Sequence, residues 1–103
     1  MQVHVQTDNH IHHTDGMDRW AAETVQQKLQ RFKDQITRVE LHLSDLSGGK
    51  NPGQGNVQCV LESRPQGLPP LAVKHQGNNV SQAIEGALEK SLRQLESALA
   101  RVA

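Results

Sequence analysis

Residues 36–45, ITRVELHLSD, alternate polar and apolar side chains from Arg38 to Ser44. Successive side chains of a β-strand point to opposite faces of a sheet, so the apolar residues of this stretch are predicted to face a core while the polar ones face water. The inward set is Val39, Leu41 and Leu43. A strand with one wet face indicates a sheet that is covered on one side only.

Three other segments have the character of strands, namely residues 2–6, 57–64 and 71–76. The second and third are preceded by the turn-forming stretches 47–56 and 65–70, which are rich in glycine and proline. These breaks predict hairpins between residues 36 and 76, whereas residues 2–6 stand apart.

Two segments repeat apolar residues at the helical period. The first is expected to start at a capping Thr14 or Asp15 and to run to about Asp34, with an inward set of Met17, Trp20, Ala21, Thr24, Val25, Leu29 and Phe32. The second follows Asn79 and continues to the C-terminus along the stripe Ile84, Leu88, Leu92, Leu95, Leu99 and Val102.

The predicted order is therefore β-α-β-β-β-α, an α+β fold. We expect a two-layer sandwich in which a four-stranded mixed sheet carries both helices on one face, with a parallel pair formed by the first β-α-β unit. Residues 1–103 are expected to form a single domain.

Composition limits the function classes. Lys and Arg number 11 against 11 Asp and Glu, so the formal charge is zero and any binding charge must be local. No apolar run approaches the roughly 20 residues that a spanning helix needs, which excludes membrane insertion. The lone Cys59 and the polar opening MQVHVQTDN favour a cytoplasmic protein.

Residues 9–16, NHIHHTDG, contain three histidines and an aspartate. Imidazoles from His10, His12 and His13 with Asp15 are candidate zinc or copper ligands, but the spacing fits no established template. In an extended segment His10 and His12 share a side while His13 points away. The favoured interpretation is a polar loop that leads into a helix, with metal binding as the minority alternative.

No catalytic set is evident. Cys59 alternates inward and is expected to be a small buried apolar residue. Asp8, Asp15 and Asp18 flank a helix start, where the helix dipole favours acids without any chemistry. The loop around Lys50 leads into a strand, unlike phosphate-binding loops, which lead into a helix. We therefore predict a non-enzyme without a cofactor or a small-molecule substrate.

The basic residues are placed unevenly. Lys28, Arg31 and Lys33 fall at the C-terminal end of the first helix, and Lys90 and Arg93 lie midway along the second. If the helices pack side by side, these cations are expected to form one patch able to meet several phosphates. The alternative is that they are ordinary exposed helix pairs and helix C-terminal charges.

The chain resembles the ribosome hibernation-promoting factor and ribosome-associated inhibitor family over nearly its whole length. The similarity is carried by MQVHVQTDN, by QQKLQRFKDQITRVELHLS and by NNVSQAIEGALEKSLRQLESAL, of which AIEGALEKSLRQL is the most specific. The β-α-β-β-β-α order agrees. The chain resembles a short form of the family, so a C-terminal dimerisation domain like that of longer members is not expected.

The resemblance implies a protein that occupies the small ribosomal subunit where messenger and transfer RNA bind and so silences idle ribosomes. Basic helix residues of the family contact ribosomal RNA. The matching positions are Lys28, Lys90 and Arg93, and Arg31 is added as a neighbour on geometry.

Two other interpretations stay open. Zero net charge favours a protein-interaction module of the same fold with weak or no RNA binding. A double-stranded RNA-binding domain is less favoured, because residues 78–84 carry no charge where that fold has lysines.

Overall fold

The computed structural model describes residues 1–50 and 55–100. Its elements follow the predicted order, and they are β1 (Gln2–Thr7), α1 (Asp15–Lys28), the 3-10 turn η1 (Gln30–Phe32), β2 (Ile36–Asp45), β3 (Val57–Pro65), β4 (Leu71–Gly77) and α2 (Val80–Ala100). Val102 and residues 51–54 of the predicted loop lie outside the described residues.

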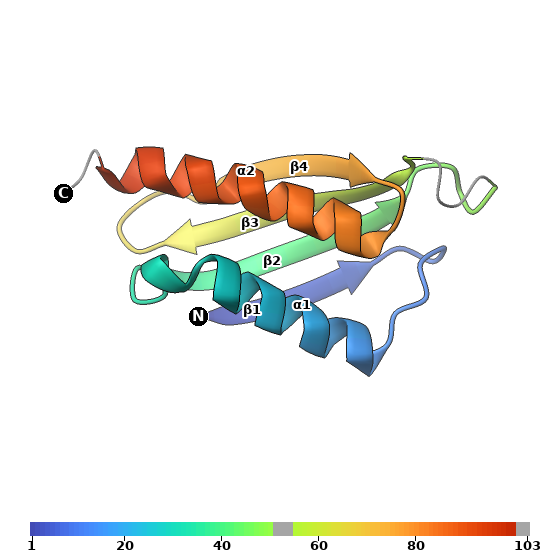
Figure 1. Cartoon of the computed structure of the whole chain (residues 1–103), viewed down its shortest axis with the longest axis horizontal. Helices are drawn as coiled ribbons and strands as arrows, with labels where there is room; N and C mark the ends of the chain where they lie inside the picture. Colours follow the sequence, from blue (N-terminus) through green and yellow to red (C-terminus); the bar gives the residue numbers. More distant parts are fainter. Residues whose placement is uncertain (51–54, 101–103) are drawn as a thin grey trace.

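The sheet confirms the predicted topology. Its strand order is β1-β2-β3-β4, with β1 parallel to β2 and the other pairs antiparallel. The register aligns apolar residues across all four strands in the row Val5, Leu41, Leu61 and Val73. Both helices cover the face to which this row points, as Figure 1 shows.

The start of β2 departs from simple alternation. Ile36 and Val39 are both buried, although two residues three positions apart on a regular strand face opposite sides of the sheet. The register of β2 against β3 shifts between Ile36 and Arg38. Such an irregularity inserts an extra residue and resets which face the strand presents, so both side chains reach the core.

Helix α1 begins as predicted but ends earlier. The Thr14 side chain accepts a hydrogen bond from the Met17 N–H at 3.0 Å, which fills one of the backbone donors that a helix start leaves open. Leu29 leaves the helical conformation at φ −103° and ψ 19°. A 3-10 turn then places Phe32 in the core. The expectation of one helix to Asp34 was wrong, because this turn continues the apolar spacing.

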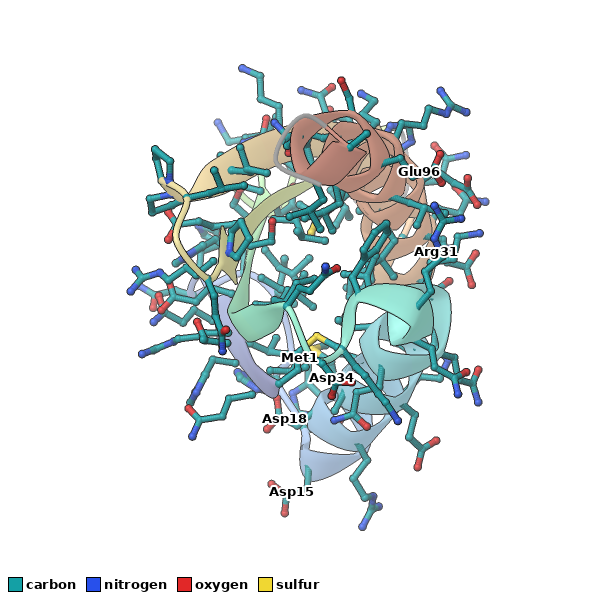
Figure 2. All side chains as sticks on the ribbon, turned by 90° about the vertical axis from the view of Figure 1, so that its left-hand side faces the viewer. Met1, Asp15, Asp18, Arg31, Asp34 and Glu96 are labelled. Atoms are coloured by element: carbon teal, nitrogen blue, oxygen red, sulfur yellow. The ribbon has the colours of Figure 1, made fainter. Side chains whose placement is uncertain are left out.

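The core lies between the sheet and the two helices. Its fully buried side chains come from every layer and include Val25, Leu29, Leu41, Leu61, Ile84, Leu88 and Leu95. Figure 2 shows the molecule from one end, with the sheet on one side and the helices on the other.

The outer face of the sheet carries an ion-pair network instead of a covering layer. The Glu40 carboxylate lies 2.7 Å from Arg38, 3.6 Å from His42 and 3.8 Å from Arg64. Arg64 also lies 2.9 Å from Glu62. This face is therefore polar and locally balanced in charge.

Candidate functional site

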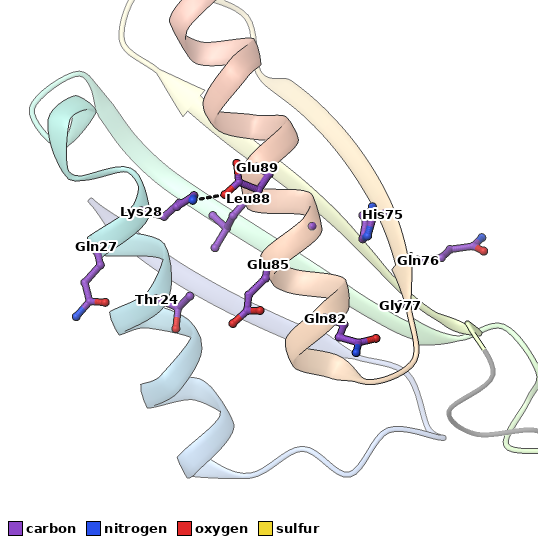
Figure 3. A pocket seen from close by; sticks show the side chains of 11 residues that line it. Thr24, Gln27, Lys28, His75, Gln76, Gly77, Gln82, Glu85, Leu88 and Glu89 are labelled. Carbon is purple, nitrogen blue, oxygen red and sulfur yellow. Dashed lines mark ion pairs between the residues drawn. The ribbon is translucent and has the colours of Figure 1, made fainter.

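The two helices lie side by side, as expected from the sequence, and Lys28 stands where α1 ends. Its ammonium forms an ion pair with the Glu89 carboxylate on α2, drawn as a dashed line in Figure 3. The hydrogen bond and charge of Lys28 hold the pKa of Glu89 below its ordinary value. The charge of Lys28, the first of the predicted cations, is therefore neutralised by Glu89.

Arg31 follows the same pattern one turn further along. Its guanidinium lies 3.7 Å from the Glu96 carboxylate, and both residues lie on the helix side of the molecule in Figure 2. The same guanidinium stacks over the Phe32 ring at 4.8 Å. Arg31 is nevertheless two-thirds exposed, so this ion pair is a weak one.

The other three predicted cations behave differently. Among residues 1–50 and 55–100, Lys33, Lys90 and Arg93 take part in no ion pair within 4.0 Å. Lys90 turns to β4, where its ammonium donates to the Lys74 carbonyl at 2.8 Å. The charge of Arg93 also contributes to the lowered pKa of Glu89.

The predicted cations therefore do not form one positive patch. Two of them face acids along the line where the helices meet, a boundary that we call the helix seam and define by Lys28, Arg31, Glu89 and Glu96. For Lys28 and Arg31 this arrangement fits the alternative interpretation of ordinary exposed ion pairs. The acids were visible in the sequence, but only the packing of α2 against α1 shows which cations they meet.

A hollow of about 770 Å³ lies beside the N-terminal half of α2. Its walls come from α1, α2 and the end of β4, and they include Thr24, Lys28, His75, Gln76, Gln82, Glu85 and Glu89 (Figure 3). Most of the residues that line it have polar side chains, and Lys28 is already paired with Glu89.

The histidine stretch forms the start of α1. One ring nitrogen of His13 lies 2.6 Å from the Asp18 carboxylate, and the other lies 3.2 Å from the Thr7 hydroxyl. This side chain therefore ties the end of β1 to the first turn of α1. The sequence did not reveal that role.

The three candidate metal ligands do not come together. The His10 ring packs against Gly49, while His12 is exposed and His13 is held by Asp18 and Thr7. Within the described part of the chain, no group of three or more His, Cys, Asp or Glu side chains is arranged to hold a metal ion. The geometry gives the metal hypothesis no support.

The acids near the start of α1 serve local structure. One carboxylate oxygen of Asp8 accepts the Asp45 N–H at 2.8 Å, and the other accepts the His10 N–H at 2.9 Å. These bonds hold the loop after β1 against the end of β2.

Cys59 is buried, as predicted. Burial raises the pKa of its thiol to about 12, so the reactive thiolate is negligible near neutral pH.

Comparison with known proteins places this geometry in a family. The model for the family described as Sigma 54 modulation protein / S30EA ribosomal protein matches residues 3–103. The chain belongs to this family. A search of curated proteins gave no match to this S30EA-family chain.

Solved structures share the fold of this S30EA-family protein. The N-terminal domain of Protein Y from Thermus thermophilus superposes with a TM-score of 0.73 at 17% identity, covering 94% of this chain and 98% of that one. A ribosomal subunit interface protein from Coxiella burnetii gives a TM-score of 0.70 at 12% identity, covering 97% and 99%. These TM-scores establish a common fold, and the family match confirms the resemblance seen in the sequence.

The described residues carry no sign of a membrane span. Neither helix combines the length and the apolarity needed to cross a bilayer.

Proposed function

We propose that this S30EA-family protein is a non-enzymatic regulator of translation that binds the small ribosomal subunit through ribosomal RNA and silences idle ribosomes. The observation that carries the proposal is the family match over residues 3–103. The fold shared with a ribosomal subunit interface protein supports it.

The proposed RNA contacts are the cations on the helices. Lys33, Lys90 and Arg93 are exposed and have no ion-pair partner among the described residues, so phosphates can approach them directly. Lys28 and Arg31 would exchange Glu89 and Glu96 for phosphate. Exposed ion pairs contribute only about 0–1 kcal/mol, so this exchange costs little.

The number of contacts sets the salt dependence. About three to five phosphate contacts predict that log affinity falls with log salt at a slope near −0.7 to −0.9 per contact. Binding should therefore be clear at low salt and much weaker at moderate salt.

Co-sedimentation with purified small subunits tests the proposal. The protein is expected to pellet with the subunits at low salt and to be released as salt rises. Arg93→Glu should weaken pelleting sharply, because it replaces a cation with an anion beside Glu89 and Glu96. Failure of the wild type to pellet at either salt concentration would remove the proposal.

A protein-interaction role is the second candidate, and two observations favour it. The formal charge is zero, and acids neutralise Lys28 and Arg31 at the helix seam. Recovery of one protein partner without ribosomal RNA in a pull-down would favour this role over RNA binding.

A further inference from the structure

The free edge of β4 is covered by side chains from α2. Lys90 donates to the Lys74 carbonyl at 2.8 Å, and Gln94 donates to the Ala72 carbonyl at 3.4 Å. β4 pairs with β3 on its other side, so these carbonyls belong to the edge that lacks a neighbouring strand. The Lys90 ammonium is thus held at the sheet edge and directed away from the helix seam.

The side chain of Lys74 lies on the other side of the same edge. Along β4, Leu71, Val73 and His75 are half-buried toward the helices, while Lys74 is exposed on the outer face of the sheet. Lys74 and Lys90 therefore flank one strand edge from its two faces. We call this pair the β4-edge lysines.

No acid lies three or four positions from Lys90 along α2. Residues three and four positions away on a helix are its surface neighbours. For Lys90 these are Gly86, Ala87, Arg93 and Gln94, which include one cation and no acid.

The neighbourhood of Lys74 is similar. Val60 lies directly opposite on β3, and the next residues on the same face of β4 are Ala72 and Gln76. The nearest acid in the register is Glu62, which is opposite Ala72 and already lies 2.9 Å from Arg64. Across residues 1–50 and 55–100, no ion pair within 4.0 Å involves either β4-edge lysine.

We propose that the β4-edge lysines form a phosphate-binding edge for ribosomal RNA, with Lys74 as a contact that the helix-based assignment does not include. This inference rests on the proposed function. On this inference, the side of α2 that faces β4 carries positive charge without neutralising acids. The cations at the helix seam, in contrast, are paired with Glu89 and Glu96.

Charge complementarity favours RNA over a protein partner at this edge. The residues beside the two lysines are glutamine, alanine and glycine, together with one further cation, Arg93, and the half-buried Val60. A protein interface normally needs a buried aromatic or aliphatic anchor. Lysine binds phosphate as a point charge without such an anchor. The hydrogen bond to the Lys74 carbonyl also positions Lys90 in advance, which reduces the entropy lost on binding.

The test compares Lys74→Gln, Lys90→Gln and the double variant with the wild type. Each replacement removes one charge and keeps a polar side chain. Gln94 already makes the equivalent bond to the Ala72 carbonyl, so glutamine at position 90 can keep the edge covered. Lys50→Gln in the loop after β2 is the matched control. Fluorescence of Trp20, the only tryptophan, checks folding.

Binding of each variant to purified small subunits is measured over a series of salt concentrations. Each single replacement is expected to lower affinity several-fold and to reduce the magnitude of the salt slope by about 0.7–0.9, with the two effects adding in the double variant. Lys50→Gln should leave the slope unchanged.

Three results would overturn the inference while the proposed function stands. In the first, the wild type binds and both glutamine variants match it. In the second, only Lys90→Gln has an effect, so that Lys90 acts without Lys74. In the third, Lys50→Gln is as damaging as the others, which indicates a non-local charge effect. If the wild type does not bind at any salt concentration, both the proposed function and the proposed phosphate-binding edge are wrong.

Discussion

Lys28 at the end of α1 and Glu89 in the middle of α2 form an ion pair across the helix seam. The pair joins two elements that are separated by three strands in the sequence and makes the boundary between the helices locally neutral. It has consequences for stability as well as for binding.

The ion pair predicts a pH dependence of stability. Lys28 lowers the pKa of Glu89 from its ordinary value of 4.5. A carboxyl whose pKa is lower in the folded state contributes stability above its unfolded pKa and loses it as pH falls through the folded value. Glu89→Gln should therefore lower the unfolding free energy slightly at neutral pH, where the exposed ion pair contributes, and leave it unchanged in acid, so that the fall below about pH 4.5 becomes flatter. Urea midpoints followed by Trp20 fluorescence from pH 3 to 7 measure this effect.

Glu23→Gln is the control for that series. Glu23 is exposed on α1 and has no ion pair within 4.0 Å among the described residues, so its removal should leave the acid profile of the wild type. If Glu89→Gln and Glu23→Gln give the same profile, the ion pair has no role in acid stability.

Gly86 allows α2 to approach β4. A Cβ atom at this position would lie 2.0 Å from the His75 ring. Gly86→Ala should therefore destabilise the fold by about 1–3 kcal/mol through overpacking, although alanine is the better helix former. In a His75→Ala background the same change should stabilise, because the ring is gone. The four proteins form a double-mutant cycle, which urea denaturation completes.

Gly16→Ala provides the comparison within α1. Its added Cβ would lie 3.7 Å from the Thr14 hydroxyl, an ordinary contact, so this change is expected to be neutral or stabilising. Equal costs at Gly16 and Gly86 would contradict the close approach of α2 to His75.

Ser91 has a buried hydroxyl with no hydrogen-bond partner among the described residues. A buried hydroxyl without a partner has lost its water without compensation. Ser91→Ala is expected to raise the free energy of unfolding by about 1 kcal/mol, from that relief together with the better helix propensity of alanine.

Ser97→Ala separates the two contributions, since Ser97 is exposed on the same helix and its replacement changes helix propensity alone. Thermal and urea unfolding of both variants measure the difference. A larger gain at Ser97 than at Ser91 would show that the buried hydroxyl is satisfied in solution.

Thr14 fixes where α1 begins. Because its hydroxyl accepts the Met17 N–H, Thr14→Ala should cost about 0.5–2 kcal/mol, whereas Thr14→Ser keeps an acceptor and should cost less. Far-UV circular dichroism during urea denaturation measures both variants. Equal losses in the two would mean that the methyl group of Thr14, and not its hydroxyl, stabilises the helix start.

The strands could be predicted because their pattern is local. The alternation of Val39, Leu41 and Leu43 depends only on the pleat of one strand, and β2 has the predicted bounds. The end of α1 could not be predicted, because Phe32 keeps the helical spacing while it belongs to a 3-10 turn. The spacing of apolar residues indicates which side chains face the core. A residue in a tight turn that follows a helix can face the core at the same spacing.

The cations of the candidate site could be identified from the sequence, but their partners could not. Lys28 meets Glu89 only because α2 packs against α1. Lys90 turns to β4 because the edge carbonyl of Lys74 needs a donor. Nothing in the sequence pattern indicates that Lys74 and Lys90 flank one strand edge. Such relationships depend on the packing of distant elements, which periodicity does not record.

The donors from Lys90 and Gln94 also bear on how copies of the protein behave toward one another. An uncovered strand edge invites another chain to add a strand, which is a route to aggregation. Side chains of α2 occupy carbonyls of the β4 edge, so addition of a foreign strand there would first have to displace them. The lysine proposed for RNA contact therefore has a second consequence in the free protein, since it covers an edge that would otherwise be open to strand addition.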